Sequence, residues 1–122
     1  MIERMKDLPP NMVGFRSSGE VTKNDFDMVI DEVEKTVDRT GKLNYLLFLD
    51  NSPADFTVGA WMKDAFLGIK NLLNWHRAAI VTDSESVIKF TDAFSYLMPG
   101  EFRGFHKNEL QAAIDWTSEK TN

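Results

Sequence analysis

Two acidic residues that could do chemistry end the two most apolar segments of the chain. Asp50 ends the segment Leu43–Asp50, and Asp83 ends the segment His76–Asp83. If both segments are parallel strands, their carboxylates share the edge of the sheet where α/β proteins usually bind ligands. A carboxylate pair could transfer protons there. Aspartates at strand ends also cap helices and form turns, and we favour this structural role.

Other residues typical of enzymes are few. The two histidines, His76 and His106, are too few and too isolated for a histidine-based metal site, and a structural or surface role is expected for each. Arg77 is expected to pair with an acidic side chain and not with a substrate. The chain has no cysteine, no glycine-rich phosphate loop and no Gly-x-Ser-x-Gly nucleophile elbow. We therefore predict a protein that is not an enzyme and has no catalytic residue, metal or cofactor.

The composition indicates one globular domain with few electrostatic partners. The 122 residues are 43% hydrophobic and 27% charged, with a formal net charge of -5. This charge argues against nucleic acid as a partner, and any membrane contact would have to be apolar. The first ten residues lack the apolar core of a signal peptide, and no apolar run approaches the ~18 residues of a membrane span. We expect a cytoplasmic protein.

The first third of the chain predicts two strands and a helix. Met1–Leu8 and Met12–Val21 are expected to form an antiparallel hairpin, with a Pro-Pro-Asn turn between them. Thr22–Lys42 is the clearest helix, because Thr22 and Asp25 have the spacing of a capping box and Gly41 follows the last apolar turn. Its apolar residues recur at helical spacing, and its other face is acidic.

The rest of the chain alternates strands and helices. Leu43–Asp50 and His76–Asp83 are apolar almost throughout, which is typical of strands covered on both faces. The other predicted elements are the helices Val58–Trp75, Glu85–Met98 and 107–120, the last with Asn108 as its cap, and the strand Glu101–His106. The order β-β-α-β-α-β-α-β-α predicts one α/β domain over residues 1–122, with a mostly parallel sheet of about five strands and four helices.

Four of these segments resemble a known family. LNYLLFLD, VGAWMKDAFLGIKNL, RAAIVTD and FHKNELQAAIDW are similar to elements of the SpoIIAA-like family of small bacterial proteins. The resemblance is strongest over Leu43–Trp116. It implies the STAS (anti-sigma-factor antagonist) fold, which is also likened to CRAL-TRIO lipid-carrier domains. It implies little about activity, because a shared fold is not a shared function.

Ser52 is the candidate phosphorylation site that this resemblance implies. In partner-switching STAS proteins a serine follows an aspartate just after the third strand, where a phosphate would meet backbone N–H groups at a helix start. Asp50, Asn51 and Ser52 occupy the matching place, although Pro53 stands where the family pattern has small residues and glycine. The alternative for Ser52 is a turn hydroxyl that satisfies the local backbone.

The second and third predicted helices carry a large apolar surface. The apolar residues of Val58–Trp75 span about 140°, against roughly 100° for a helix that covers a sheet. One interpretation is that the two helices bury each other on one face of the sheet. The other is that they line a pocket for an apolar ligand, or open at a membrane surface. Tyr96 falls away from the apolar side of Glu85–Met98. The residues expected to line the pocket are Trp61, Met62, Phe66, Phe90, Phe94 and Met98.

The main functional hypothesis is a non-enzymatic binding module for a small apolar or lipid-like ligand. Reversible membrane association would use the second and third helices, so that the cytoplasmic protein is at times peripheral to a membrane. The alternative is a protein–protein regulatory module of the anti-sigma-factor-antagonist (partner-switch) type, with Ser52 as its site. Exposed strand edges and apolar helix faces leave a homodimer open.

Overall fold

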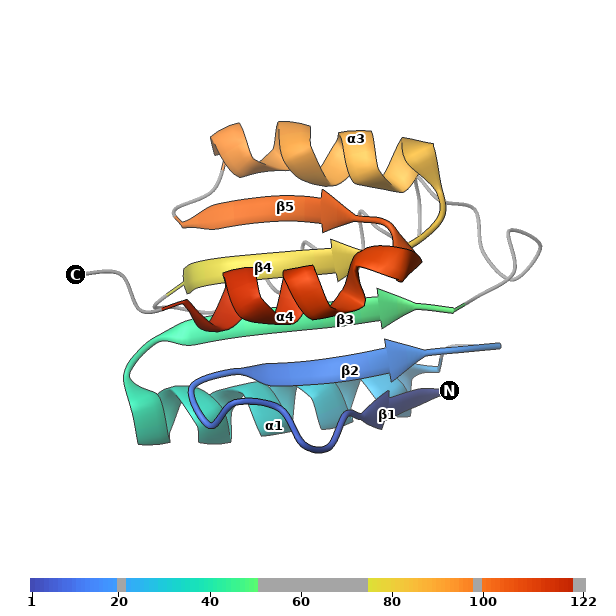
Figure 1. The fold of residues 1–122 in the computed structure, drawn as a ribbon. Coiled ribbons are helices and arrows are strands. Elements are labelled where there is room, and N and C mark those ends of the chain that lie inside the picture. The colour runs from blue at the N-terminus through green and yellow to red at the C-terminus, as the bar shows by residue number, and fades with distance from the viewer. Residues whose placement is uncertain (20–21, 51–74, 98–99, 120–122) are drawn as a thin grey trace.

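A computed structural model describes residues 1–19, 22–50, 75–97 and 100–119. Its strands are β1 (Ile2–Arg4), β2 (Val13–Ser17), β3 (Leu43–Leu49), β4 (Trp75–Val81) and β5 (Glu101–Phe105). They form a five-stranded mixed sheet in the order β1-β2-β3-β4-β5 (Figure 1). β1 pairs with β2 antiparallel, and the pairs β2–β3, β3–β4 and β4–β5 are parallel. The predicted α/β fold with about five strands is confirmed.

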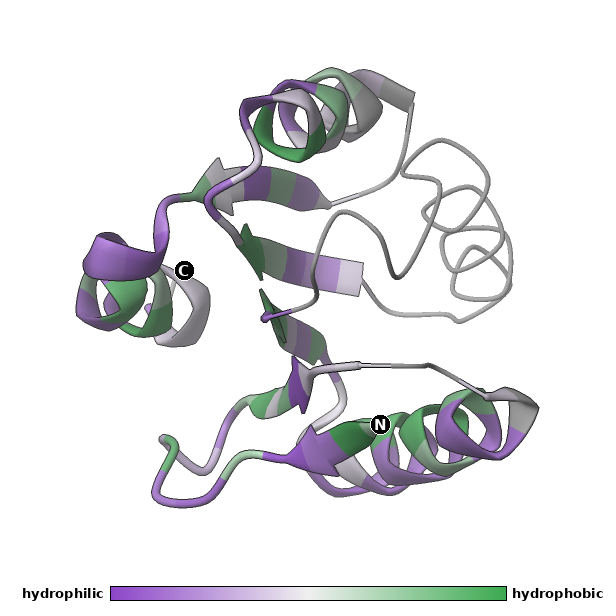
Figure 2. Ribbon diagram, turned by 90° about the vertical axis from the view of Figure 1, so that its right-hand side faces the viewer, coloured by the Kyte–Doolittle hydropathy of each residue, from purple (hydrophilic) through white to green (hydrophobic). Residues whose placement is uncertain are grey.

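Helices cover both faces of this sheet. They are α1 (Lys23–Thr40), α3 (Glu85–Phe94) and α4 (Leu110–Ser118), with short 3₁₀ turns at Ser95–Leu97 and Lys107–Glu109. α1 lies on one face and α4 on the other, and α3 lies beside β5 at the end of the sheet, with Val87 buried in the core on the α1 side (Figure 2). Of the four predicted helices, these three lie in the described part of the chain. The fourth, Val58–Trp75, lies outside it except for Trp75, which begins β4 and was wrongly assigned to the helix.

The two faces have separate cores. Buried residues on the α1 and α3 face include Phe15, Val29, Val33, Leu43, Tyr45, Leu47, Ile80, Val87 and Phe102. Those on the α4 face include Met12, Leu46, Ala79, Val81, Phe105 and Ala113. Alternate residues of β3 and β4 belong to opposite cores, which explains why these strands are apolar almost throughout.

The caps of α1 are those that the sequence predicts. The Thr22 side chain accepts a hydrogen bond from the Asp25 N–H, and the Asp25 carboxylate accepts one from the Thr22 N–H at 2.8 Å. Gly41 has a φ of 79° and donates its N–H to the Val37 carbonyl oxygen. This left-handed conformation is cheap only for glycine, so the helix ends there.

The first strand is shorter than predicted. β1 ends at Arg4 and not at Leu8, and Asp7 has a φ of 62°, which interrupts an extended strand. The physical reason lies in the apolar spacing. Ile2 packs in the core under α1, whereas Met5 and Leu8 pack on the α4 face. Three side chains spaced by three residues cannot all lie on one face of a strand, whose period is two.

Two helix boundaries also differ from the prediction. α3 ends at Phe94, and a 3₁₀ turn continues the chain to Leu97. The last helix begins with a 3₁₀ turn whose cap is His106 and not Asn108. The His106 N–H donates to the Glu109 carboxylate at 2.9 Å, so the glutamate three residues on selects the cap position.

Candidate functional site

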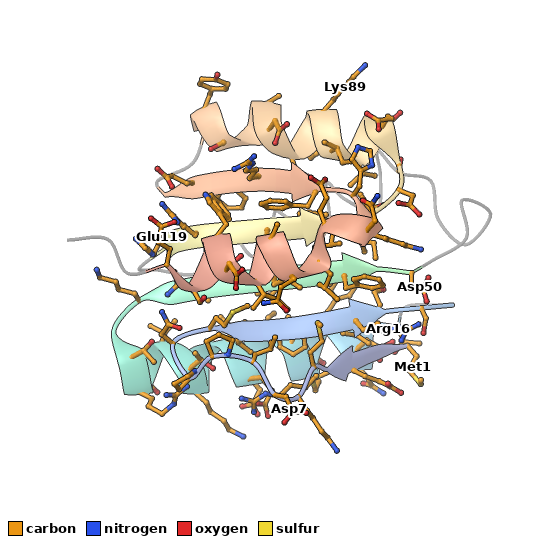
Figure 3. The ribbon with its side chains drawn as sticks, viewed as in Figure 1. Met1, Asp7, Arg16, Asp50, Lys89 and Glu119 are labelled. Carbon is orange, nitrogen blue, oxygen red and sulfur yellow. The ribbon has the colours of Figure 1, made fainter. Side chains whose placement is uncertain are left out.

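The carboxyl edge of the parallel strands holds a cluster of charged side chains. Asp50 follows β3, Arg16 comes from β2, and Lys107 follows β5. The Asp50 carboxylate accepts hydrogen bonds from Arg16 Nη2 and, at 2.8 Å, from Lys107 Nζ. Arg16 and Asp50 lie side by side at this end of the sheet (Figure 3). The hydrogen bond from Lys107, and then that from Arg16, hold the pKa of Asp50 below its usual value.

An aromatic ring lies beneath the same two cations. Arg16 Cζ is 5.7 Å from the centroid of the Phe48 ring, and Lys107 Nζ is 5.8 Å from it. Phe48 is half-buried on the α4 face. We call Arg16, Phe48, Asp50 and Lys107 the carboxyl-edge cluster. It joins β2, β3 and the segment after β5 at one point.

Asp83 reaches the same edge through Lys107. Its Oδ1 accepts a hydrogen bond from the Lys107 backbone N–H at 3.3 Å, and Lys107 Nζ contacts Asp50. The two predicted acids therefore share one edge, as expected from their places at strand ends. Asp83 orders the backbone after β5, and Asp50 is engaged by two cations.

This arrangement is poorly suited to proton transfer by Asp50. A general acid or base works best when its pKa is close to the working pH. The pKa of Asp50 is instead lowered, and both carboxylate oxygens accept hydrogen bonds from cations. Within the described ranges, no three histidine, aspartate or glutamate side chains are grouped so that they could hold a metal ion. The cluster favours the structural role for Asp50.

Arg16 and Lys107 were not singled out from the sequence. Arg16 pairs with Phe48 in the β2–β3 register, and the next pair is Ser17 with Leu49. This pairing is what places Arg16 near Asp50, the residue that follows Leu49. This register depends on how the two strands align, and the sequence alone does not show the alignment. Lys107 could have been found as the first cation after the last strand, once all the parallel strand ends were assumed to meet.

The two histidines lie at opposite ends of the parallel strands. His76 is near the start of β4, and His106 directly follows β5. His106 Nε2 is 3.1 Å from Glu85 Oε1 at the start of α3. His76 Nδ1 is 2.6 Å from Asn44 Oδ1, and the Asn44 amide donates to the Asn11 carbonyl oxygen at 2.9 Å. Asn44 Oδ1 therefore accepts, and His76 Nδ1 carries the proton. Burial lowers the pKa of His76.

Arg77 pairs with acidic residues, as predicted. Its Nε donates to Glu101 at 2.9 Å, and its Nη1 is 3.3 Å from Glu119 Oε2. Nη1 also donates to the Trp116 carbonyl oxygen at 2.6 Å, and the guanidinium lies 4.8 Å from the centroid of the Trp116 ring. This arginine thus holds the end of α4 against β4.

Of the six residues predicted to line an apolar pocket, the structure describes one side chain. Phe90 lies on α3 with 38% of its surface exposed. Phe94 is the last residue of α3. Tyr96, which was not among the predicted residues, lies in the following 3₁₀ turn and is 92% exposed. The predicted site residues outside the described part of the chain are Ser52, Trp61, Met62, Phe66 and Met98.

A row of aromatic rings crosses the sheet on the face that α1 and α3 cover. The ring centroids of Phe15 and Tyr45 are 5.8 Å apart, those of Tyr45 and Trp75 6.1 Å, and those of Trp75 and Phe102 5.1 Å. The four rings come from β2, β3, β4 and β5 in turn. Burial raises the pKa of Tyr45. That these four rings form one row was not predicted from the sequence, in which Trp75 was assigned to the helix Val58–Trp75.

Comparisons with known proteins agree with this architecture. A SpoIIAA-like family model matches residues 12–118. Among solved structures, the chain is similar to an uncharacterized protein of the DUF3478 family from Shewanella loihica PV-4, which has a SpoIIAA-like fold. The two chains are 26% identical with a TM-score of 0.62, over 96% of this chain and 90% of that one. A comparison with curated proteins gives no match. In the described residues, no helix has the length and apolar character needed to cross a membrane.

Proposed function

Because the chain belongs to the SpoIIAA-like family, we propose that it is a non-enzymatic binding module for a small apolar or lipid-like ligand. The proposal rests on the exposure of two aromatic side chains at α3 and the turn that follows it. In the described residues, the exposed large apolar side chains are Met1, Phe90 and Tyr96. Both aromatic ones belong to α3 and the turn that follows it. We therefore place the contact with the ligand, or with a membrane that delivers it, on this side of the molecule.

The energy available to these two residues suits reversible contact. Complete burial of a large apolar side chain is worth roughly 1.5–3 kcal/mol. Phe90 retains 38% of its surface and Tyr96 retains 92%, so burying both would stabilise a complex by roughly 2–4 kcal/mol. A tyrosine also has a polar tip that suits the boundary between an apolar phase and water. The net charge of -5 leaves apolar contact as the attraction to a lipid surface.

The interior beneath α3 supports the same proposal. Val87 of α3 is buried in the core that contains Phe102 and Ile80, and Trp75 packs against that core. The aromatic row therefore begins under the helix that exposes Phe90. Phe90 follows the buried Val87 by three residues on the helix, so its exposed ring lies next to this apolar interior. At the carboxyl edge, by contrast, Asp50 is engaged by two cations and Asp83 accepts a backbone N–H, so these acids offer no apolar surface to a ligand.

The first test is native mass spectrometry of the full chain purified without detergent, with organic extraction of the same sample. We expect a stoichiometric hydrophobic adduct, whose mass gives the ligand class. Addition of oleate to the stripped protein should restore an adduct. A chain that carries no adduct and takes up no oleate would count against the proposal.

The second test uses exposed positions, where substitution changes binding more than folding. The double variant Phe90→Ser and Tyr96→Ser should lose most of the adduct, and it should bind phosphatidylcholine vesicles less than the parent chain. Lys89→Ser is the matched control, because Lys89 is also exposed on α3 (Figure 3) and has no aromatic ring. Thermal melts should show both variants folded. Equal adduct levels in all three chains would refute the role of this surface.

A further inference from the structure

The outer edge of β5 is closed by side chains from α3 and from the 3₁₀ turn that follows it. An edge strand normally presents unpaired N–H and C=O groups, which can pair with a strand of another molecule. Here the Phe102 N–H donates to Ser95 Oγ at 3.0 Å, and the Gly104 N–H donates to Asp92 Oδ1 at 2.9 Å. The Phe105 carbonyl oxygen accepts the Thr82 N–H and therefore faces the β4 side of the strand. Because these directions alternate along a strand, the Phe102 and Gly104 amides face away from β4. Two successive outward amides of β5 are therefore already occupied.

Gly104 is what brings α3 close enough to supply these acceptors. A Cβ atom at this position would lie 2.8 Å from the Cα of Ile88, a backbone atom of α3. Any other residue would push the helix away from the strand. α3 runs along β5 (Figure 1), and Val87 and Thr91 of the helix are fully buried. The helix is thus held on β5 by its buried side chains, and Asp92 and Ser95 turn to the edge.

We propose that Asp92 and Ser95 prevent β5 from pairing with β5 of a second copy of this chain. A pairing strand would have to supply carbonyl oxygens to the Phe102 and Gly104 amides in place of these side chains. The Asp92 carboxylate would then lie unpaired beside those carbonyl oxygens, which also carry negative partial charge. A two-fold β5–β5 contact is the closed arrangement expected of two identical edges. This inference does not depend on the proposed ligand.

The experiment compares the self-association of three chains by sedimentation velocity over a range of concentrations. In the double variant Asp92→Ala and Ser95→Ala, both acceptors are absent. In the control Asp92→Asn and Ser95→Thr, both acceptor oxygens are kept. We expect the alanine variant to reach twice the mass of the parent chain as concentration rises, and the control to match the parent. Far-UV circular dichroism shows that the chains compared are folded.

Amide hydrogen exchange tests the same proposal without requiring dimerisation. In the parent chain, the Phe102 and Gly104 amides should exchange slowly. At low concentration the alanine variant should exchange them about tenfold faster or more, as expected for loss of one hydrogen bond to each amide. At high concentration, pairing should protect them again.

Three results would overturn the proposal. The folded alanine variant could keep the mass of the parent chain at every concentration. The control could associate as the alanine variant does, which would mean that the acceptor oxygens are not responsible. The two amides could also exchange in the parent chain as fast as unprotected amides, in which case Asp92 and Ser95 do not close the edge.

Discussion

Replacement of Arg77 should destabilise the fold more than the loss of either of its acidic partners. The Arg77 side chain is 10% exposed, whereas those of Glu101 and Glu119 are 62% and 59% exposed. Ion pairs with exposed acids are worth ~0–1 kcal/mol each. The hydrogen bond from the guanidinium to the Trp116 carbonyl oxygen is charge-assisted and is worth ~1.5–3 kcal/mol. The stacking on the Trp116 ring adds roughly 0.5–2 kcal/mol.

These contributions are not additive, so Arg77→Ala should lower the free energy of unfolding by ~2–4 kcal/mol. Glu101→Gln and Glu119→Gln should each cost under about 1 kcal/mol. Arg77→Lys should fall between them, because it keeps the charge and loses the planar fork. The assay is urea denaturation followed by circular dichroism. With a slope of ~2 kcal/mol per molar urea, the midpoint for Arg77→Ala should fall by roughly 1–2 M.

One result would refute this reasoning. If Glu101→Gln costs as much as Arg77→Ala, the ion pair carries the stability and the contact with the end of α4 does not. A double variant, Arg77→Ala with Glu101→Gln, measures the coupling between the two residues directly. We expect a coupling energy well below the cost of Arg77→Ala alone.

Four further substitutions test local contacts. Thr22→Ala removes the α1 cap and should cost ~1 kcal/mol in urea denaturation; no change would mean that the cap is dispensable. Lys107→Met removes the main cause of the lowered pKa of Asp50, so an NMR titration should show that pKa rising toward its usual value. Because the folded-state pKa is lowered, Asp50 stabilises the fold above its unfolded pKa, and this contribution is lost as pH falls through the folded pKa. The variant should therefore lose less stability on acidification. Gly104→Ala, whose Cβ would meet helix backbone at 2.8 Å, should cost ~1–3 kcal/mol. Gly14→Ala, which meets the end of a leucine side chain at 2.6 Å, should cost less, and the reverse order would contradict the packing argument.

The parts of the fold that local chemistry determines were predictable from the sequence. Each end of α1 is determined by residues close to it in sequence. The helix begins after Thr22, which forms a capping box with Asp25, and it ends at Gly41. The apolar strand β3 needs only its own composition to be recognised. β1 was harder, because its end depends on which face of the sheet Met5 and Leu8 reach. That choice is made by tertiary packing.

The candidate site shows the same division. Asp50 and Asp83 were placed at one edge from their positions after two strands. The partners of Asp50 were missed, since Arg16 is 34 residues and Lys107 57 residues away in sequence. Only the strand order brings them together. Tyr96 was expected to fall away from the apolar side of a helix that continues to Met98; it is 92% exposed, but it lies in the 3₁₀ turn that follows α3.

Occupied amides on the two edge strands bear on how this chain can bind a partner. At the other end of the sheet, the Ile2 N–H of β1 donates to Asp25 Oδ1 of α1 at 3.2 Å. Side chains from helices thus occupy outward amides on both edge strands, β1 and β5. Binding modes that add a strand to a sheet need such amides to be unoccupied. From the two proposals above, we expect no homodimer through β5, and we expect recognition at the aromatic surface of α3 and the turn that follows it.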